Sequence, residues 1–117
     1  MKGILEEKSF RFAIRIVNLY KYLSENKKEY VMAKQVLRSG TSIAANIAEA
    51  QFAQSKPDFG TKMQISLKEA NETRFWLRLL SETSYIDSTA SDSLISDCEE
   101  IINMLISSCK TINPRKV

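Results

Sequence analysis

The chain has 117 residues, of which 26% are charged, and a formal net charge of +3 at pH 7. This length supports one domain around one core. Only three Gly and two Pro are present, which favours helices over a turn-rich β architecture. The absence of histidine excludes Ser-His-Asp and Cys-His nucleophilic sites, the Glu-x-x-His ligand pair of di-iron bundles, and helical ribonuclease-like domains built on an Arg…His motif.

The sequence shows no sign of a membrane or export segment. No apolar run approaches the roughly 20 residues that a bilayer-spanning helix needs. Glu6 and Glu7 lie where a signal peptide requires its apolar stretch. We therefore expect a cytoplasmic protein with no membrane partner.

Charge is distributed unevenly along the chain. Residues 1–40 hold nine basic and four acidic side chains, residues 41–86 are balanced, and residues 87–117 hold three basic and five acidic side chains. The basic segment can attract nucleic acid. The alternative is a head-to-tail charge match between helices or between subunits, and the sequence leaves both open.

Four helices are predicted from apolar residues that recur at steps of three and four. We place them at about residues 8–26, 30–52, 57–82 and 88–112. Ser55 can cap the third helix with Pro57 and Asp58 in its first turn, Asp87 can cap the fourth, and Pro114 stops it. Short connections between such helices predict an all-α, antiparallel up-down-up-down four-helix bundle that forms a single domain over residues 1–117.

The second helix is unusual because no charged side chain occurs from Ser39 to Ala48. Successive side chains are rotated by about 100° around the helix axis, and this rotation places them in three sectors of the helix surface. One is an apolar sector, one has small side chains, and one is a polar stripe of Gln35, Ser39, Ser42, Asn46 and Glu49. We expect this helix to be central in the bundle or to pack against another subunit, with Gly40 allowing a close approach or a kink.

Two cysteines, Cys98 and Cys109, lie close to three turns apart and so share a helix face. Their separation of roughly 16 Å along one helix is too long for a disulfide within the chain. We interpret them as thiols of the core.

Three carboxylates are candidates for chemistry. Glu69 and Glu72 lie on a partly apolar stripe of the third helix, and Glu49 ends the polar stripe of the second. Such a set can hold a divalent metal or act in acid–base catalysis. The structural alternative, which we favour, is that these acids meet Arg38, Arg74, Lys68 or serine hydroxyls between helices. A buried charge needs a partner, so we pair Arg38 with Glu69 or Glu72, and we expect no catalytic residue, metal or cofactor.

Basic and aromatic residues of the first two helices are candidates for nucleic-acid contacts. The candidates for phosphate contacts are Lys8, Arg11, Arg15, Lys34 and Arg38. Tyr20, Tyr22 and Tyr30 can stack on bases. Tyr20 fits the core better, and only Tyr22 lies clearly towards the polar side. The alternative is that the cations are simply solvated.

Several segments resemble one protein family. Residues 38–50 read RSGTSIAANIAEA, residues 55–59 read SKPDF, and residues 66–80 read SLKEANETRFWLRLL. These resemble the patterns RSGTSI-x-ANI-x-EA, SK-x-DF and ALKEANET-x-x-WL-x-LL of the 23S ribosomal RNA intervening-sequence proteins. The resemblance implies an antiparallel four-helix bundle and a ring-shaped homopentamer, with no catalytic residues to carry over.

The resemblance also implies a function. Some members are related to the accessory variability protein of diversity-generating retroelements, a basic pentamer that engages nucleic acid and a reverse transcriptase. We therefore expect a non-catalytic homo-oligomer that binds structured RNA or DNA, or a nucleic-acid-processing protein partner. The polar residues Ser39, Ser42, Asn46, Glu49, Glu69 and Glu72 would then serve structure or assembly. The alternative is a protein-interaction scaffold with no nucleic-acid role, and a third is a metal-dependent enzyme that uses Glu49, Glu69 and Glu72.

Overall fold

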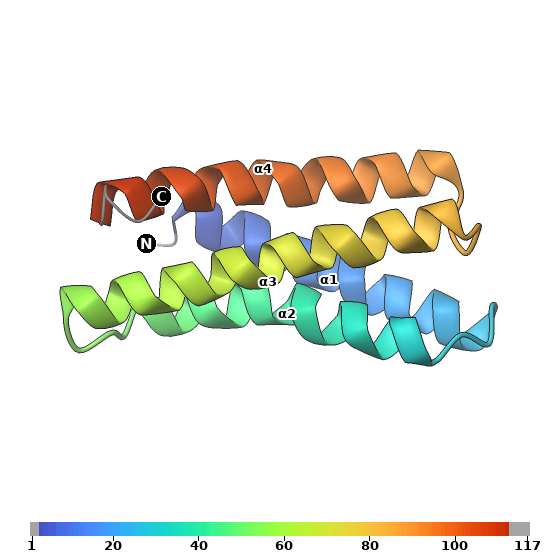
Figure 1. Cartoon of the computed structure of the whole chain (residues 1–117). Coiled ribbons are helices and arrows are strands. Elements are labelled where there is room, and N and C mark those ends of the chain that lie inside the picture. Colours follow the sequence, from blue (N-terminus) through green and yellow to red (C-terminus); the bar gives the residue numbers. More distant parts are fainter. Residues whose placement is uncertain (1–2, 113–117) are drawn as a thin grey trace.

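The computed structural model describes residues 3–112, which form four helices and no strand. The helices are α1 (Ile4–Glu25), α2 (Val31–Ala50), α3 (Lys56–Glu82) and α4 (Ser88–Ile112). Successive helices run in alternating directions in Figure 1. The predicted all-α, antiparallel bundle is therefore confirmed.

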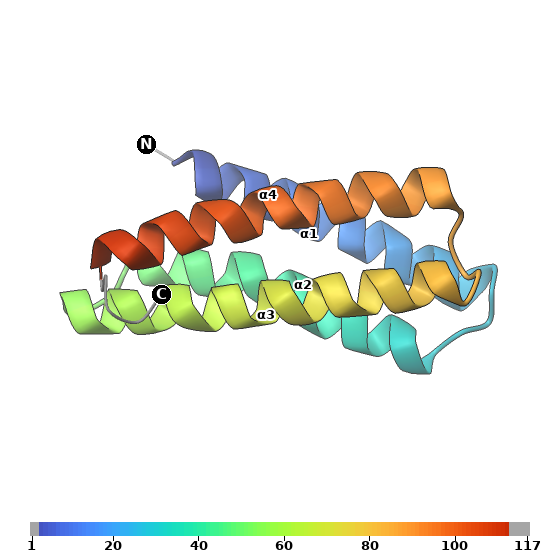
Figure 2. The same cartoon turned by 45° about the horizontal axis from the view of Figure 1, so that its top comes forward.

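Each helix contacts the two helices beside it and none across the diagonal, within the part of the chain that the structure describes. The α2–α3 side is the most extensive and the α1–α4 side the thinnest. Figure 2 shows the reason, because α4 crosses α1 at an angle instead of lying along it. The four sides of the bundle are thus unequal.

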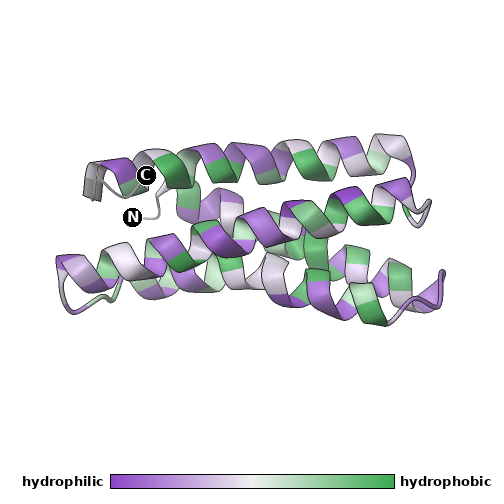
Figure 3. Cartoon of the chain, in the orientation of Figure 1, coloured by the Kyte–Doolittle hydropathy of each residue, from purple (hydrophilic) through white to green (hydrophobic). Residues whose placement is uncertain are grey.

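The core consists of apolar side chains from all four helices. Ile16 of α1, Ile43 of α2, Leu77 of α3 and Leu105 of α4 are fully buried. Hydrophobic and hydrophilic residues alternate along every helix in Figure 3, as expected for helices with one buried face. No helix within residues 3–112 is both long and apolar enough to cross a membrane.

Side chains close the first turns of three helices. The backbone N–H of Asp58 donates to Ser55 Oγ at 3.2 Å, and the backbone N–H of Ala90 donates to Asp87 Oδ1 at 2.8 Å. These two caps were predicted. Glu29 supplies a third, which the sequence analysis missed, by accepting the backbone N–H of Ala33 at 3.0 Å. Each of these bonds satisfies a donor that has no partner inside its helix.

The predicted helix bounds need small corrections. α1 begins at Ile4, four residues before the predicted start, because Glu6 and Glu7 complement the positive end of the helix dipole in its first turn. α2 covers residues 31–50 rather than 30–52, and α3 begins one residue earlier than predicted. The predicted stop at Pro114 lies outside the described residues.

Candidate functional site

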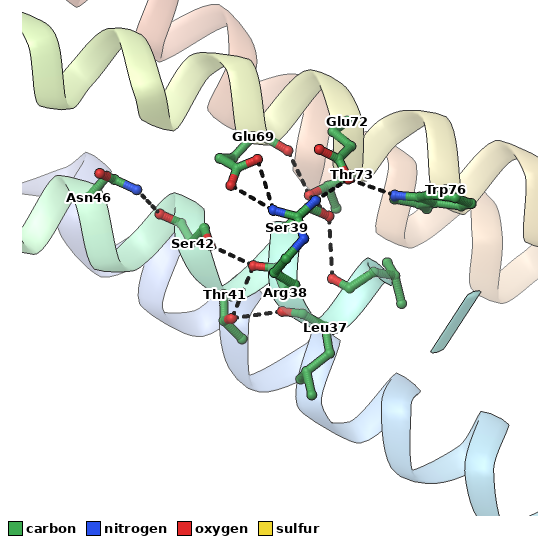
Figure 4. A network of polar contacts seen from close by, with 11 residues as sticks. Leu37, Arg38, Ser39, Thr41, Ser42, Asn46, Glu69, Glu72, Thr73 and Trp76 are labelled. Atoms are coloured by element: carbon green, nitrogen blue, oxygen red, sulfur yellow. Dashed lines mark hydrogen bonds and ion pairs between the residues drawn. The ribbon is translucent and has the colours of Figure 1, made fainter. Parts of the chain in front are cut away.

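The residues in the polar stripe of α2 make two kinds of hydrogen bond, one to another helix and one within their own helix. Ser39 is fully buried and accepts a hydrogen bond from Thr73 Oγ1 of α3 at 2.9 Å. Ser42 and Asn46 instead donate to carbonyls of their own helix, at 2.6 Å and 2.8 Å. Figure 4 shows both arrangements. Of these three residues, only Ser39 makes an interhelical hydrogen bond.

A second buried hydroxyl supports the same side of the bundle. Ser66 of α3 is fully buried, and its Oγ donates to the backbone carbonyl of Ile43 in α2 at 2.9 Å. A buried polar group costs free energy unless it is hydrogen-bonded. Together with Ser39 and Thr73, this contact ties α2 and α3 together with satisfied polar groups.

Gly40 allows α1 to approach α2 closely. A Cβ at this position would lie 2.8 Å from both Cγ1 and Cγ2 of Ile16. Real Cβ atoms are not found at such a distance, so a side chain here requires the two helices or Ile16 to shift. α2 continues unbroken from Val31 to Ala50. The close approach, rather than a kink, therefore explains this glycine.

Arg38 joins α2 to α3 outside the buried hydroxyls (Figure 4). Its Nη1 lies 3.0 Å from Glu69 Oε2, and its Nη2 pairs with Glu72. The indole N–H of Trp76 donates to the same Glu72 oxygen at 3.0 Å. The hydrogen bonds from Trp76 and from Arg38 lower the pKa of Glu72, so this carboxylate stays charged at neutral pH. The predicted pairing of Arg38 is present.

The third candidate carboxylate lies apart from the other two. Glu49 pairs with Lys62 at 2.8 Å, whereas Glu69 and Glu72 share Arg38. Within residues 3–112, no group of three or more His, Cys, Asp or Glu side chains is placed to hold a metal ion. The structure therefore does not place Glu49 with Glu69 and Glu72 as ligands of one metal ion.

The two cysteines are buried and reduced, as predicted for core thiols. Cys98 Sγ donates to the carbonyl of Ala70 at 3.3 Å, and burial raises the pKa of this thiol to about 12. Burial also raises the pKa of Cys109. A thiol that stays protonated is a poor nucleophile, so both serve packing.

Most of the cations predicted to contact phosphate are used inside the chain. Lys8 Nζ lies 2.7 Å from Glu100, and Arg15 Nη1 lies 2.6 Å from Asp97. Both acids belong to α4, so the head-to-tail charge match between helices is present. Arg11 pairs with Glu7 within α1. With Arg38 bound by α3, Lys34 is the one cation of the predicted set without an ion pair among the described residues.

Basic residues also lie in and beside the connection between α1 and α2, in a segment that includes the acidic Glu25 and Glu29. We call the following residues of this segment the turn patch: Lys21, Tyr22, Lys27, Lys28, Tyr30 and Lys34. None of its four lysines makes an ion pair with a residue in the described range. The two tyrosines are 41% and 51% exposed. Basic and aromatic side chains in one place are what single-stranded nucleic acid requires.

Local geometry supports this patch. Lys27 Nζ lies 5.9 Å from the centre of the Tyr22 ring, within the range of a cation–π contact. Lys28 has a φ of 55°, a left-handed conformation that favours Gly or Asn and is uncommon for lysine. This conformation is common just after a helix end, and Ser84 adopts it after α3. Tyr20, by contrast, packs against the core as predicted.

Of the turn patch, Tyr22, Tyr30 and Lys34 are among the residues predicted from the sequence, whereas Lys21, Lys27 and Lys28 are not. The signal for two of these lysines is the polar connection Asn26-Lys27-Lys28. Ion pairing between distant helices decides which lysines stay available, and a helix periodicity does not contain that information. The structure therefore moves the candidate interface from the length of α1 to its C-terminal end.

Comparison with known proteins identifies the family to which this bundle belongs. The fold defines the structural class of this protein, which is an antiparallel four-helix bundle. Gly40 allows α1 and α2 to approach closely, and a buried hydroxyl pair joins α2 and α3. The family model described as 23S rRNA-intervening sequence protein matches residues 3–107. The chain belongs to this family, as its motifs indicated.

A solved structure shows the same fold. It is the crystal structure, at 1.70 Å resolution, of a protein with unknown function from the S23 ribosomal protein family of Bacteroides thetaiotaomicron. The two chains are 55% identical with a TM-score of 0.90, and the match covers 92% of this chain and 99% of that one. The comparison with curated proteins gives no match.

Proposed function

We propose that this protein is a non-catalytic, cytoplasmic homo-oligomer that binds structured RNA or DNA through the turn patch. The observation that carries the proposal is the availability of the four lysines of the patch beside two exposed tyrosines. Lysines supply sequence-independent attraction to phosphates. Tyrosines add stacking on unpaired bases.

Exposed apolar residues support self-association. Ile14 and Val17 of α1 are 49% and 36% exposed. They lie about 100–160° around the helix from the buried Ile16 and Leu19, as expected from 100° per residue. α2 adds the exposed Ala45 and Ala48 within its uncharged segment. An uncharged outer surface of this kind suits a second copy of the chain, and the family resemblance favours a ring of five.

Oligomerisation strengthens the proposed binding. One turn patch offers four lysines, which is a modest number for tight binding. A ring presents the same patch once per subunit, and linked sites raise the effective concentration for each further contact. Assembly and nucleic-acid binding are therefore parts of one function in this proposal.

The binding proposal is tested by salt titration with labelled hairpin RNA, duplex DNA and single-stranded DNA. We expect tight binding near 50 mM salt and a steep salt slope. The double variant Lys27→Gln/Lys28→Gln should weaken binding and reduce the magnitude of the slope by about two, because each lost phosphate contact removes roughly one. The matched control is Lys56→Gln/Lys110→Gln, which removes the same charge at the other end of the bundle. An equal loss in both variants contradicts a local interface.

The assembly proposal is tested by light scattering. Five chains of 13.3 kDa each give a mass of about 66 kDa. The variant Ile14→Lys/Val17→Lys should reduce that mass, because it places charge on the apolar surface of α1. The control Phe75→Lys changes an exposed apolar residue of α3 and should leave the mass unchanged. A wild-type mass of one chain across micromolar concentrations refutes the proposal.

One observation favours the protein-interaction scaffold as a second candidate. Four of the five cations predicted to bind phosphate are held in ion pairs by the chain itself. A scaffold predicts no nucleic-acid binding even near 50 mM salt. It also predicts one stoichiometric protein partner that stays bound after nuclease treatment. These two results together would replace the first proposal.

A further inference from the structure

A pocket opens between α1 and α4 at the same end of the bundle as the turn patch. Its volume is about 400 Å³. Residues of the C-terminal half of α1 and of the start of α4 line it, together with Ile86 from the connection between α3 and α4. This volume lies within the roughly 300–1,000 Å³ range of small-molecule sites in proteins.

The floor of the pocket is apolar. Leu19, Ile86 and Leu94 line it, and their exposed fractions are 7%, 6% and 5%. These are the largest values among the buried apolar residues of the core. The pocket therefore gives access to the edge of the core, where the divergence of α4 from α1 leaves it incompletely covered. An apolar flat group can gain burial there.

The rim of the pocket is polar. The side chain of Asn18 is exposed and makes no hydrogen bond to any residue that the structure describes. Asp87, which also lines the pocket, uses Oδ1 to cap α4 and retains Oδ2 as an acceptor. An amide offers both a donor and an acceptor, and a carboxylate offers acceptors. The rim can therefore form hydrogen bonds with a group that has donors and acceptors at its edge.

Tyr22 connects this pocket to the turn patch, because it belongs to both. Lys27 lies over its ring and is available for a phosphate. A ligand that fills the pocket and continues along the patch therefore has an apolar flat part, a polar edge and an attached anionic chain. A nucleobase on its sugar-phosphate backbone has these three properties.

We propose that the pocket receives one unpaired nucleobase of the nucleic acid that the turn patch binds. The inference rests on the proposed function and gives it a substrate class, namely RNA or DNA with an unpaired base next to a helical stem. Leu19, Ile86 and Leu94 contact the faces of the base, and Asn18 and Asp87 bond to its edge. Unpaired bases in loops and bulges are the parts of RNA that proteins read by stacking and edge hydrogen bonds.

The test compares two RNA probes with the same stem, one closed by an unpaired loop and one fully paired with blunt ends. Ala90→Phe fills the pocket from its rim without changing charge. We expect it to weaken binding of the looped RNA by roughly tenfold, as for the loss of one stacked base, and to leave binding of the paired duplex unchanged. Ser96→Phe adds the same ring to α4 at an exposed position that does not line the pocket, and it should change neither affinity.

An abasic substitution in the loop sharpens the test. One abasic position should reproduce the roughly tenfold loss in the wild-type protein and cause no further loss in the Ala90→Phe variant. If Ala90→Phe does not fold, as judged by circular dichroism, Ala90→Leu replaces it. Asn18→Ala should change the preference among the four bases at that loop position while leaving duplex binding intact.

The outcomes separate the pocket from the patch. Equal wild-type affinity for the looped and paired probes, or losses from Ala90→Phe and the abasic position that add, overturns the pocket proposal and leaves the turn patch in place. If neither probe binds, or if Lys27→Gln/Lys28→Gln changes no affinity, the proposed function fails and the pocket proposal fails with it.

Discussion

The α2–α3 side and the α1–α4 side of the bundle are held together by different means. Between α2 and α3, buried hydroxyls of Ser39, Ser66 and Thr73 form hydrogen bonds beneath the Arg38 ion pairs. Between α1 and α4, two ion pairs at the surface join the helices beside an open pocket. The comparison teaches that one side of the bundle supplies stability and the opposite side supplies accessible surface.

The energies of these contacts explain the division. A buried polar group that loses its partner costs about 1–3 kcal/mol. An exposed ion pair contributes about 0–1 kcal/mol and weakens further in salt. The α2–α3 side is therefore sensitive to the loss of a single hydroxyl, whereas the α1–α4 side can lose a charge at small cost.

The largest expected difference lies in the apolar contacts of the two sides. Ile43→Ala removes a fully buried side chain of α2 and should lower the free energy of unfolding by about 3–4 kcal/mol. Leu94→Ala should cost about 2 kcal/mol, because water can fill the space that opens from the pocket. Urea denaturation measures both values. A larger loss for Leu94→Ala than for Ile43→Ala would invert the comparison.

The buried hydroxyl pair gives the next largest effect. Thr73→Val keeps the shape but leaves Ser39 without its interhelical partner, and we expect a loss of about 1–2 kcal/mol. Adding Ser39→Ala should restore part of it, since removing both partners leaves no unsatisfied group. The control is Thr61→Val, because the exposed Thr61 makes a bond only to its own helix. Its denaturation midpoint should not move.

Gly40→Ala is expected to change the free energy of unfolding by about 1 kcal/mol, and the sign of this change depends on the residue at position 16. Gly40→Ala should destabilise the protein, because overpacking against Ile16 costs about 1–3 kcal/mol and exceeds the gain of about 1 kcal/mol in helix propensity. In an Ile16→Ala background the two Cγ atoms are gone, and the Cβ at 3.2 Å is the close atom that remains. A shift of a few tenths of an ångström relieves that contact, so the same substitution should there stabilise the protein by up to about 1 kcal/mol. Thermal melts of the four proteins decide the matter, and destabilisation in both backgrounds speaks against the close contact.

The contacts of Glu72 with Arg38 and Trp76 predict that the free energy of unfolding varies with pH. The variation should be under about 1 kcal/mol, because Glu72 is one-third exposed. Trp76 and Arg38 lower the pKa of Glu72 in the folded protein. The stabilisation is then present above the unfolded pKa of about 4.3 and is lost as the pH falls through the folded pKa. Wild type should therefore exceed Glu72→Gln in stability at pH 7, and the gap should shrink towards pH 3. A gap that stays constant with pH excludes this linkage.

The smallest effects belong to the α1–α4 ion pairs. Arg15→Gln should lower the free energy of unfolding by about 0.5 kcal/mol or less at low salt, and the difference should vanish near 1 M salt. Lys8→Gln should behave in the same way. A cost above about 1 kcal/mol that persists in high salt means that this side carries stability after all.

Much of the fold could be predicted because its signals are local. Helix spacing, the caps at Ser55 and Asp87, and the small residue at Gly40 each act within a few residues of their own position. The pairing of Arg38 with Glu69 and Glu72 followed from charge complementarity between two partly apolar stripes. The start of α1 was placed too late because apolar periodicity outweighed the acidic first turn.

The candidate site could be predicted only in part. Which of the predicted basic side chains stay available depends on α4, whose Asp97 and Glu100 form ion pairs with Arg15 and Lys8. Likewise, the pocket depends on the angle between α1 and α4 rather than on any motif. Both depend on how the first and the last helix pack against each other. Local sequence patterns do not contain that information.

The unequal sides also set an order of assembly. Three of the four helix contacts join neighbours along the chain, and only α1–α4 joins its two ends. Local contacts form quickly, while closing a long loop is entropically costly. We expect α1 and α4 to dock last on folding and to separate first on unfolding. The pocket then exists only after α1 and α4 have docked. A ligand that contacts both helices in the pocket should therefore slow their separation and lengthen the lifetime of the native state.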